Sequence, residues 1–301
     1  MSGSSIAVVG VGAIGGVVAA ALGDLAHHDL TLCVRTPFDV LEVELPGGRS
    51  RVDATILANP GQARPVDWVL VATKAHQTAD ALPWLRGLTA EGTTRWAFLQ
   101  NGVDQVERGN RLAAGGTGPA LAPADVVPVI VNLPASRPAP GRVIQSLNGM
   151  LTSPDDEAGR AFATLFEGSR ISVRSHADFT TIAWRKLLMN ASLGGVCAFI
   201  SGSDEAVAEG PLRRFVLDLM LEALPVARAE GAEIEEADCE QILERIMQAA
   251  PDHWSSIAVD RREGRPMEWE ARNAVIGRRG RKHGISTPRH DALTDLLRAI
   301  G

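Results

Sequence analysis

The sequence of 301 residues lacks several features that would point to particular classes of protein. Its basic residues form no long run and its net charge is −6, which argues against nucleic acid as the main partner. No apolar run reaches the length of a membrane span, so no membrane partner is expected. Residues 1–5 lead directly into an apolar stretch without the pattern of a signal peptide, and we therefore expect a cytoplasmic protein.

Cysteine and lysine are both scarce. The three cysteines, Cys33, Cys197 and Cys239, lie far apart and form no Cys-x-x-Cys pair, so we expect buried free thiols and no metal site. Only three of the 30 basic residues are lysines, and the others are arginines. Arginine stays charged and cannot give up a proton in a reaction, whereas lysine can. This bias makes Lys74 and Lys186 candidates for positions that require an ammonium group.

One stretch near the start has the pattern of a phosphate-binding loop. The apolar run Ile-Ala-Val-Val ends in Gly-x-Gly-x-x-Gly at Gly10, Gly12 and Gly15, with Ala13 and Ile14 inside the motif. The first glycine allows a sharp turn, the second lets a pyrophosphate approach the backbone, and the third lets a helix pack closely on the strand. The N–H groups of that helix's first turn then face the anion. A purely structural strand–turn–helix is the alternative.

Strand and helix patterns alternate through the first part of the chain, which predicts a parallel sheet. The length allows two domains of ordinary size. From residue 178 onward the periodicity is helical with almost no strand signal. We therefore predict an α/β protein with an N-terminal doubly wound Rossmann-type sheet over residues 1–175 and an all-helical domain over residues 176–301. The expected elements are strands at 30–34, 67–72, 96–99, 126–131, 142–147 and 171–173, a hairpin within 40–54, and helices at 78–88, 104–112, 155–166, 178–198, 211–230 and 238–249.

The end of the second predicted strand indicates which dinucleotide would bind. An NAD-binding unit usually has an acid here for the ribose 2′-hydroxyl, but this chain has Arg35 and Thr36. A guanidinium suits a 2′-phosphate, so the expected cofactor is NADP(H). Lys74 follows the third strand at the same edge of the sheet. The alternative is that Arg35 is a solvated surface residue.

A second group of polar residues lies in the helical part. Lys186 and Asn190 are four residues apart and share one helix face, where they could hold a carbonyl oxygen and a neighbouring polar group. Glu268 stands between Met267 and Trp269, which favours partial desolvation. The alternatives are a surface lysine beside a helix asparagine, and a solvated acid paired with Arg272 four residues on.

Taken together, these stretches resemble the ketopantoate reductase family (2-dehydropantoate 2-reductases) over nearly the whole chain. The order and spacing of the pieces are more specific than any one of them. The pieces are the loop at residues 10–15, Arg35, Thr73-Lys74-Ala75, Gln100-Asn101-Gly102-Val103, Trp184-Arg185-Lys186, Asn190, Ser255-Ser256, Asp260, Glu268, Asn273 and Gly284-Ile285-Ser286-Thr287-Pro288.

The resemblance implies a set of roles. Lys186 would be the general acid that protonates a ketone oxygen, and Glu268 would tune and orient it. The implied cofactor-binding residues are Gly10, Gly12, Ala13, Ile14, Gly15, Arg35, Lys74, Asn101 and Glu268, and the implied substrate-binding residues are Asn101, Lys186, Asn190 and Ser256. The implied reaction is the NADPH-dependent reduction of a small 2-keto acid, with 2-dehydropantoate as leading substrate and pantothenate biosynthesis as its setting. A homodimer is compatible with this assignment.

Three positions depart from the family pattern. Gly194 replaces a second asparagine one helical turn after Asn190, Asp204 replaces another pocket asparagine, and Ala274 replaces a glycine. We expect Gly194 to remove a hydrogen-bond donor and to open space in the substrate pocket. The alternatives are a related reductase of the same two-domain plan acting on another ketone or 2-keto acid, and an NADP-binding sensor that does no chemistry.

Overall fold

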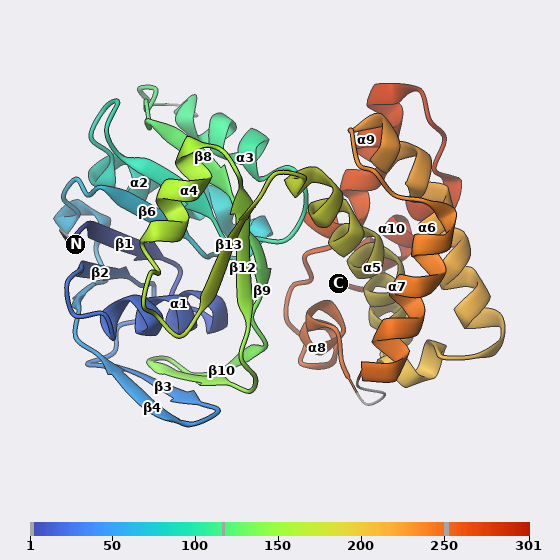
Figure 1. Ribbon diagram of the computed structural model, residues 1–301, viewed down its shortest axis with the longest axis horizontal. Helices are drawn as coiled ribbons and strands as arrows, with labels where there is room; N and C mark the ends of the chain where they lie inside the picture. Colours follow the sequence, from blue (N-terminus) through green and yellow to red (C-terminus); the bar gives the residue numbers. More distant parts are fainter. Residues whose placement is uncertain (1–2, 116–117, 250–252) are drawn as a thin grey trace. The chain divides into compact units, whose positions relative to one another are not determined.

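The computed structural model describes residues 3–115, 118–249 and 253–301, and the chain divides into two compact units (Figure 1). Unit 1 comprises Met1–Gln100 and Gln105–Phe179, and unit 2 comprises Asn101–Asp104 and Thr180–Gly301. The sequence places the boundary between residues 175 and 176. In the structure the chain passes into unit 2 after Phe179, and the short segment Asn101–Asp104 also belongs there.

Unit 1 is built on a six-stranded sheet in which every neighbouring pair is parallel. Its order is β5-β2-β1-β6-β7-β8, so successive strands are added on one side of β1 and then, from β6, on the other. Such a reversal leaves a crevice at the carboxyl ends of the two strands where it occurs, here β1 and β6. The predicted Rossmann-type fold is confirmed. The strands are β1 Ser5–Val9, β2 Asp29–Cys33, β5 Thr55–Leu57, β6 Trp68–Val71, β7 Arg95–Phe98 and β8 Asp125–Pro128.

Helix α1 (Ala13–Gly23) is buried along most of its length because it is covered on two sides. It packs on the parallel sheet and also on a second sheet of order β10-β11-β3-β4 (Figure 1). A Cβ at Gly16 would come within 2.6 Å of the Val143 side chain in β11. A helix enclosed in this way is apolar all round, which matches its run of alanine, valine and glycine. The second sheet comprises β3 Leu41–Leu45, β4 Gly48–Val52, β10 Ala135–Ala139 and β11 Arg142–Gln145.

Two predicted elements of unit 1 differ from the structure. The helix expected over 78–88 is a 3-10 segment, η2 (Ala75–Ala81), followed by α2 (Leu82–Leu88), because Pro83 suits a first helical turn and not a helix interior. The strand expected over 126–131 is two strands, β8 and β9 (Ile130–Asn132), in different sheets. Pro128 is the last residue of β8, which is an edge strand of its sheet, where a residue without an N–H is tolerated. The remaining elements are η1 Pro60–Gln62, α3 Gln105–Ala113, β12 Met150–Pro154, α4 Glu157–Thr164 and β13 Ser172–His176.

Every regular element in the described residues of unit 2 is helical. The long helix α5 (Phe179–Ile200) is buried over most of its second half, where its small residues allow close approach of other helices. Gly231 (φ 92°) follows α6 and Gly284 (φ 68°) follows α9, as expected of glycines that end helices in the left-handed region. The other helices are η3 Asp204–Val207, α6 Gly210–Ala229, α7 Glu236–Ala249, α8 Ser256–Arg262, the π-helix η4 Glu270–Ala274, α9 Val275–His283 and α10 Pro288–Ile300.

Candidate active site

The three glycines of the loop after β1 have different structural tasks. Gly10 has φ 93°, and a Cβ there would lie 2.7 Å from the Thr73 backbone nitrogen at the end of β6. A Cβ at Gly15 would overlap the carbonyl oxygen of Gly10, so this glycine is needed for the close contact of α1 with the loop. A Cβ at Gly12 would meet nothing within 4 Å. The space beside Gly12 is therefore open, as a cradle for a phosphate requires.

The end of α1 that follows this loop is suited to an anion. Gly12 is the N-cap residue and provides no side-chain cap, and there is no acid in the helix's first turn. The first N–H groups of a helix have no partners within it, and together with the helix dipole they attract negative charge. Ala13 and Ile14 begin the helix and are partly buried. The geometry fits a pyrophosphate bound at residues 10–15.

Two basic residues follow the carboxyl ends of β2 and β6, the two strands that flank β1 in the sheet. Arg35 lies just after β2 and is exposed, and none of the ion pairs or hydrogen bonds found between described residues involves its side chain. Lys74 directly precedes η2, just after β6. The buried Gln100 donates to the Thr73 carbonyl oxygen at 2.9 Å and to the Thr78 hydroxyl at 2.9 Å, which fixes this edge. Unit 1 thus carries all the predicted nucleotide-binding residues except Asn101 and Glu268.

Unit 2 holds the candidate proton donor. Lys186 and Asn190 lie on α5, one turn apart, and both are partly buried. Burial, the largest cause, and the positive charge of Arg272 lower the pKa of Lys186, and the negative charge of Glu268 raises it, so that the pKa falls from 10.5 to about 7. An acid with a pKa near neutral can both hold and release a proton at the pH of the cell. This is the strongest electrostatic feature that we find in the predicted site.

Glu268 lies just before η4 and is 3% exposed, so the alternative of a solvated surface acid is wrong. The Asn101 amide donates to the Glu268 carboxylate, with 3.2 Å between Nδ2 and Oε2. An ion pair of 3.1 Å between Asp104 and Arg278 holds the Asn101–Asp104 segment in unit 2. Asn101 is therefore placed beside the candidate catalytic residues, although it follows a strand of unit 1 in the sequence.

The buried Arg272 connects two predicted substrate-binding residues. Its Nη1 donates to the Ser256 hydroxyl oxygen at 2.9 Å, and its Nη2 donates to the backbone carbonyl oxygen of Asn190 at 3.2 Å. Ser256 is the first residue of α8 and is exposed. Unit 2 thus brings together five of the predicted residues: Asn101, Lys186, Asn190, Ser256 and Glu268.

One expectation about the departures from the family pattern is corrected by the structure, and a second departure has a partner within the protein. Gly194 does not open space, because a Cβ there would lie 2.7 Å from Nη2 of Arg272. The guanidinium already occupies that volume. Asp204 is 1% exposed and pairs with His253, with 2.7 Å between Nδ1 and the carboxylate. That hydrogen bond raises the pKa of His253 above its usual value, and it gives the Asp204 carboxylate a partner within the protein.

Sequence reasoning considered Arg272 only as an exposed partner of Glu268 and missed its buried position. The π-helix η4 turns two consecutive side chains, Arg272 and Asn273, toward consecutive glycines of α5. A Cβ at Gly195 would lie 2.6 Å from Nδ2 of Asn273, which donates to the Ala191 carbonyl oxygen at 2.8 Å. The glycine pair in the middle of a helix was the available signal, because glycine is unfavourable there unless another group needs the space.

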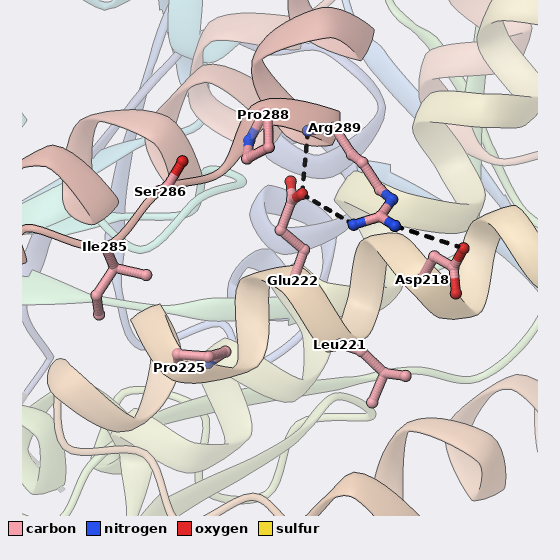
Figure 2. A pocket seen from close by; sticks show the side chains of 8 residues that line it. All are labelled: Asp218, Leu221, Glu222, Pro225, Ile285, Ser286, Pro288 and Arg289. Atoms are coloured by element: carbon pink, nitrogen blue, oxygen red, sulfur yellow. Dashed lines mark hydrogen bonds and ion pairs between the residues drawn. The ribbon is translucent and has the colours of Figure 1, made fainter.

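A surface groove on unit 2 contains an acidic side chain that has a structural role (Figure 2). It measures about 490 Å³ and lies along α6 and the segment that leads into α10. The Glu222 carboxylate in its wall accepts hydrogen bonds from the backbone N–H groups of Arg289 (3.0 Å) and His290 (2.8 Å). These groups belong to the first turn of α10, so Glu222 caps that helix.

Among residues 3–115, 118–249 and 253–301, no three histidine, cysteine or acidic side chains are grouped as a metal ion would require. Within the same ranges, no helix combines the length and apolar character needed to cross a membrane.

A doubly wound parallel sheet with an open glycine-rich loop after its first strand is the architecture of dinucleotide-binding proteins, and the buried lysine of lowered pKa is a group that an oxidoreductase could use as a proton donor. Residues 6–156 match the family model described as "Ketopantoate reductase PanE/ApbA", and residues 178–301 match "Ketopantoate reductase PanE/ApbA C terminal". The chain belongs to the ketopantoate reductase family. Membership implies an enzyme that acts on CH–OH groups with a nicotinamide cofactor.

Several proteins similar to the chain are named as ketopantoate reductases or 2-dehydropantoate 2-reductases. A 2-dehydropantoate 2-reductase of Caulobacter vibrioides is 40% identical over 98% of this chain and 99% of its own length. A 2-dehydropantoate 2-reductase of Mycobacterium tuberculosis is 37% identical over 98% and 97%. A solved structure of a dimeric ketopantoate reductase from Staphylococcus aureus is 25% identical, with a TM-score of 0.84 and 98% of each chain covered.

Proposed function

We propose that this chain reduces a small 2-keto acid to the 2-hydroxy acid with NADPH, and that 2-dehydropantoate is the preferred substrate. The observation that carries the proposal is the cluster of Lys186, Glu268 and Asn101 in unit 2, in which the lysine has a pKa of about 7. The relatives named 2-dehydropantoate 2-reductases support the choice of substrate.

The cofactor would be held chiefly by unit 1. The open space at Gly12 and the N-terminus of α1 would receive the pyrophosphate, and Arg35 and Lys74 would meet further phosphate charge. When bound, a nicotinamide cofactor supplies the hydride that reduces the ketone carbon. The exposed Arg35, in a position where an NAD-binding unit has an acid, favours NADP(H) over NAD(H).

Residues of unit 2 would bind the keto acid and move the proton. Lys186 gives its Nζ proton to the ketone oxygen, whose developing negative charge the ammonium also stabilises. Glu268, whose charge raises the pKa of Lys186, keeps that proton available. Asn101, Asn190 and Ser256 bind the carboxylate and hydroxyl groups of the substrate.

The direct test is to follow NADPH oxidation by the purified chain with a panel of 2-keto acids that includes 2-dehydropantoate. We expect saturable oxidation, with the highest kcat/KM for 2-dehydropantoate. Tight NADPH binding without oxidation by any member of the panel would support a sensor instead. A higher kcat/KM for a 2-keto acid that lacks the terminal hydroxyl would support the proposed reaction but contradict 2-dehydropantoate as the preferred substrate.

The loop glycines allow a matched pair of variants. Gly12→Val should leave thermal stability nearly unchanged, because the new side chain enters open space, but it should weaken NADPH binding about tenfold or more by filling the cradle. Gly15→Val should destabilise the fold, because its side chain would overlap Gly10. Thermal unfolding and NADPH titration of both proteins distinguish the two roles. Undiminished NADPH affinity in Gly12→Val would argue against the assigned cradle.

The pKa of Lys186 predicts the pH dependence. Ketone reduction needs the protonated lysine, so kcat/KM should be highest below about pH 7 and fall roughly tenfold per pH unit above it. Oxidation of the 2-hydroxy acid needs the neutral lysine and should rise over the same range. Glu268→Gln removes a charge that raises this pKa and should move the fall to lower pH. A reduction rate that stays constant to about pH 9 would contradict the assignment.

The S. aureus relative is described as dimeric, and we propose that this chain also forms a homodimer. Light scattering during size-exclusion chromatography would report twice the 31.9 kDa chain mass. A mass equal to one chain at micromolar concentration would contradict this.

A further inference from the structure

Arg272 is a buried charge whose role is not explained by the proposed reaction. It is 1% exposed, although arginine is rarely buried to this extent without a paired group. Its two terminal nitrogens donate to the Ser256 hydroxyl and the Asn190 carbonyl, and no described residue accepts a hydrogen bond from its buried Nε. Ser256, which accepts through its side chain, belongs to the predicted substrate-binding set, and Asn190 accepts through its backbone carbonyl oxygen. The guanidinium is therefore built into the site and not only into the core.

Gly194 makes room for this guanidinium. The distance of 2.7 Å between a Cβ built at Gly194 and Nη2 of Arg272 is shorter than real Cβ atoms show, so any side chain here would displace the arginine. The π-helix η4 supplies the matching geometry from the other side. Gly194 and Arg272 thus form a complementary pair. The guanidinium lies beside Gly194, at the position where the family pattern has an asparagine side chain.

The hydrogen bond from Arg272 decides how the Ser256 hydroxyl can act. The oxygen of Ser256 accepts from Nη1, so its own O–H points away from the guanidinium and is available as a donor. Ser256 is exposed, so this donor can reach a ligand. A hydroxyl that accepts from a cation is polarised, and such chains of hydrogen bonds strengthen one another. An anionic acceptor is the group that this donor suits best.

The charges around Arg272 keep it protonated and couple it to Lys186. Burial lowers the pKa of Arg272 and the negative charges of Glu268 and Asp260 raise it, and the resulting pKa of about 10 leaves the guanidinium charged at neutral pH. Its charge in turn lowers the pKa of Lys186. A 2-keto acid has its carboxylate next to the ketone, so a cation beside the proton donor also favours that carboxylate.

We propose that Arg272, seated in the space left by Gly194, is a positioning residue that fixes the Ser256 hydroxyl as the hydrogen-bond donor for the substrate's carboxylate. This inference rests on the proposed 2-keto acid reductase function. It adds a determinant of substrate class to that function. Recognition of the carboxylate through Arg272 and Ser256 favours 2-keto acids over ketones that have no carboxylate. The arginine acts through Ser256 and does not touch the reacting atoms.

Two substitutions separate the geometry of Arg272 from its charge. Arg272→Lys keeps a positive charge, but a single ammonium group cannot replace the two guanidinium nitrogens that donate to Ser256 and Asn190. KM for the 2-keto acid should therefore rise about tenfold, while the pH profile is retained. Arg272→Met removes the charge as well. It should raise KM by at least as much and should move the alkaline fall of kcat/KM to higher pH, because Lys186 loses a neighbouring cation.

Ser256→Ala tests the path of the effect. It should raise KM to a similar degree, and the double variant Ser256→Ala/Arg272→Lys should show little more than either single change, because the two residues act as one donor. Arg228→Met is the matched control, since Arg228 also belongs to unit 2 and donates to a backbone carbonyl, that of Ile234, at 2.8 Å. We expect its KM and pH profile to equal those of the unchanged protein.

The measurements are kcat and KM for 2-dehydropantoate across pH, NADPH affinity by fluorescence titration, and thermal unfolding. An unchanged KM in a folded Arg272→Lys protein overturns the proposal, and so does full additivity with Ser256→Ala. If Arg272→Met does not fold, the Arg272→Lys and Ser256→Ala results decide. If the protein without substitutions reduces no 2-keto acid, the proposed function itself is contradicted. If it reduces 2-keto acids but its KM does not respond to changes at Arg272, only the role of Arg272 is contradicted.

Discussion

Replacing Lys186 by alanine should lower turnover by about a hundredfold or more, the usual contribution of a general acid, while NADPH affinity changes little. The lysine is the group whose pKa the fold brings from 10.5 to about 7, so its removal takes away the proton that the ketone oxygen needs. Stopped-flow measurement of NADPH oxidation at saturating 2-keto acid would report the loss directly. Cofactor titration of the same protein would show whether binding is retained.

Lys186→Arg separates proton transfer from charge. Arginine can stabilise a developing alkoxide but cannot release a proton near neutral pH, so turnover should stay close to that of the alanine variant. Lys282→Ala is the control, because Lys282 is an exposed lysine of the same unit that pairs with Glu230 at 2.9 Å. Its turnover should equal that of the unchanged protein. Normal turnover in Lys186→Arg would refute the assigned role.

Local patterns were sufficient to predict the parts of the fold that depend on neighbouring residues. The glycine spacing predicted the β1–α1 turn, and the proline–glycine pair after Leu45 predicted the β3–β4 hairpin. The division of residues 126–131 between two sheets was not predictable in this way. Both strands are short and apolar, and which sheet each one joins depends on partners distant in the sequence.

The candidate site shows the same division between local and distant information. The shared face of Lys186 and Asn190 follows from helix periodicity. The contact of Asn101 with Glu268 joins residues that are 167 positions apart, and only the resemblance to a family grouped them. The contact of Arg272 with Gly194 depends on the packing of η4 on α5, and the glycine pair in the middle of α5 was the signal for it in the sequence.

The choice of cofactor gives the second large expected effect, and it rests on Arg35 alone. Arg35→Ala should weaken NADPH binding by about 10- to 100-fold, since a hydrogen bond to a charged group contributes roughly 1.5–3 kcal/mol. NADH affinity should change little, because NADH has no 2′-phosphate for the guanidinium to bind. Arg35→Asp should go further and favour NADH, because a carboxylate repels the phosphate and can accept from a ribose 2′-hydroxyl.

Arg35 is exposed, so the preference should also depend on salt. Raising the ionic strength should weaken NADPH binding more than NADH binding in the unchanged protein, and this difference should vanish in Arg35→Ala. Arg49→Ala is the matched control, because Arg49 is another exposed arginine of unit 1, on β4. Its affinities for both cofactors should equal those of the unchanged protein. Equal dissociation constants for NADPH and NADH before any substitution would show that Arg35 is a solvated surface residue and that the chain does not select NADPH.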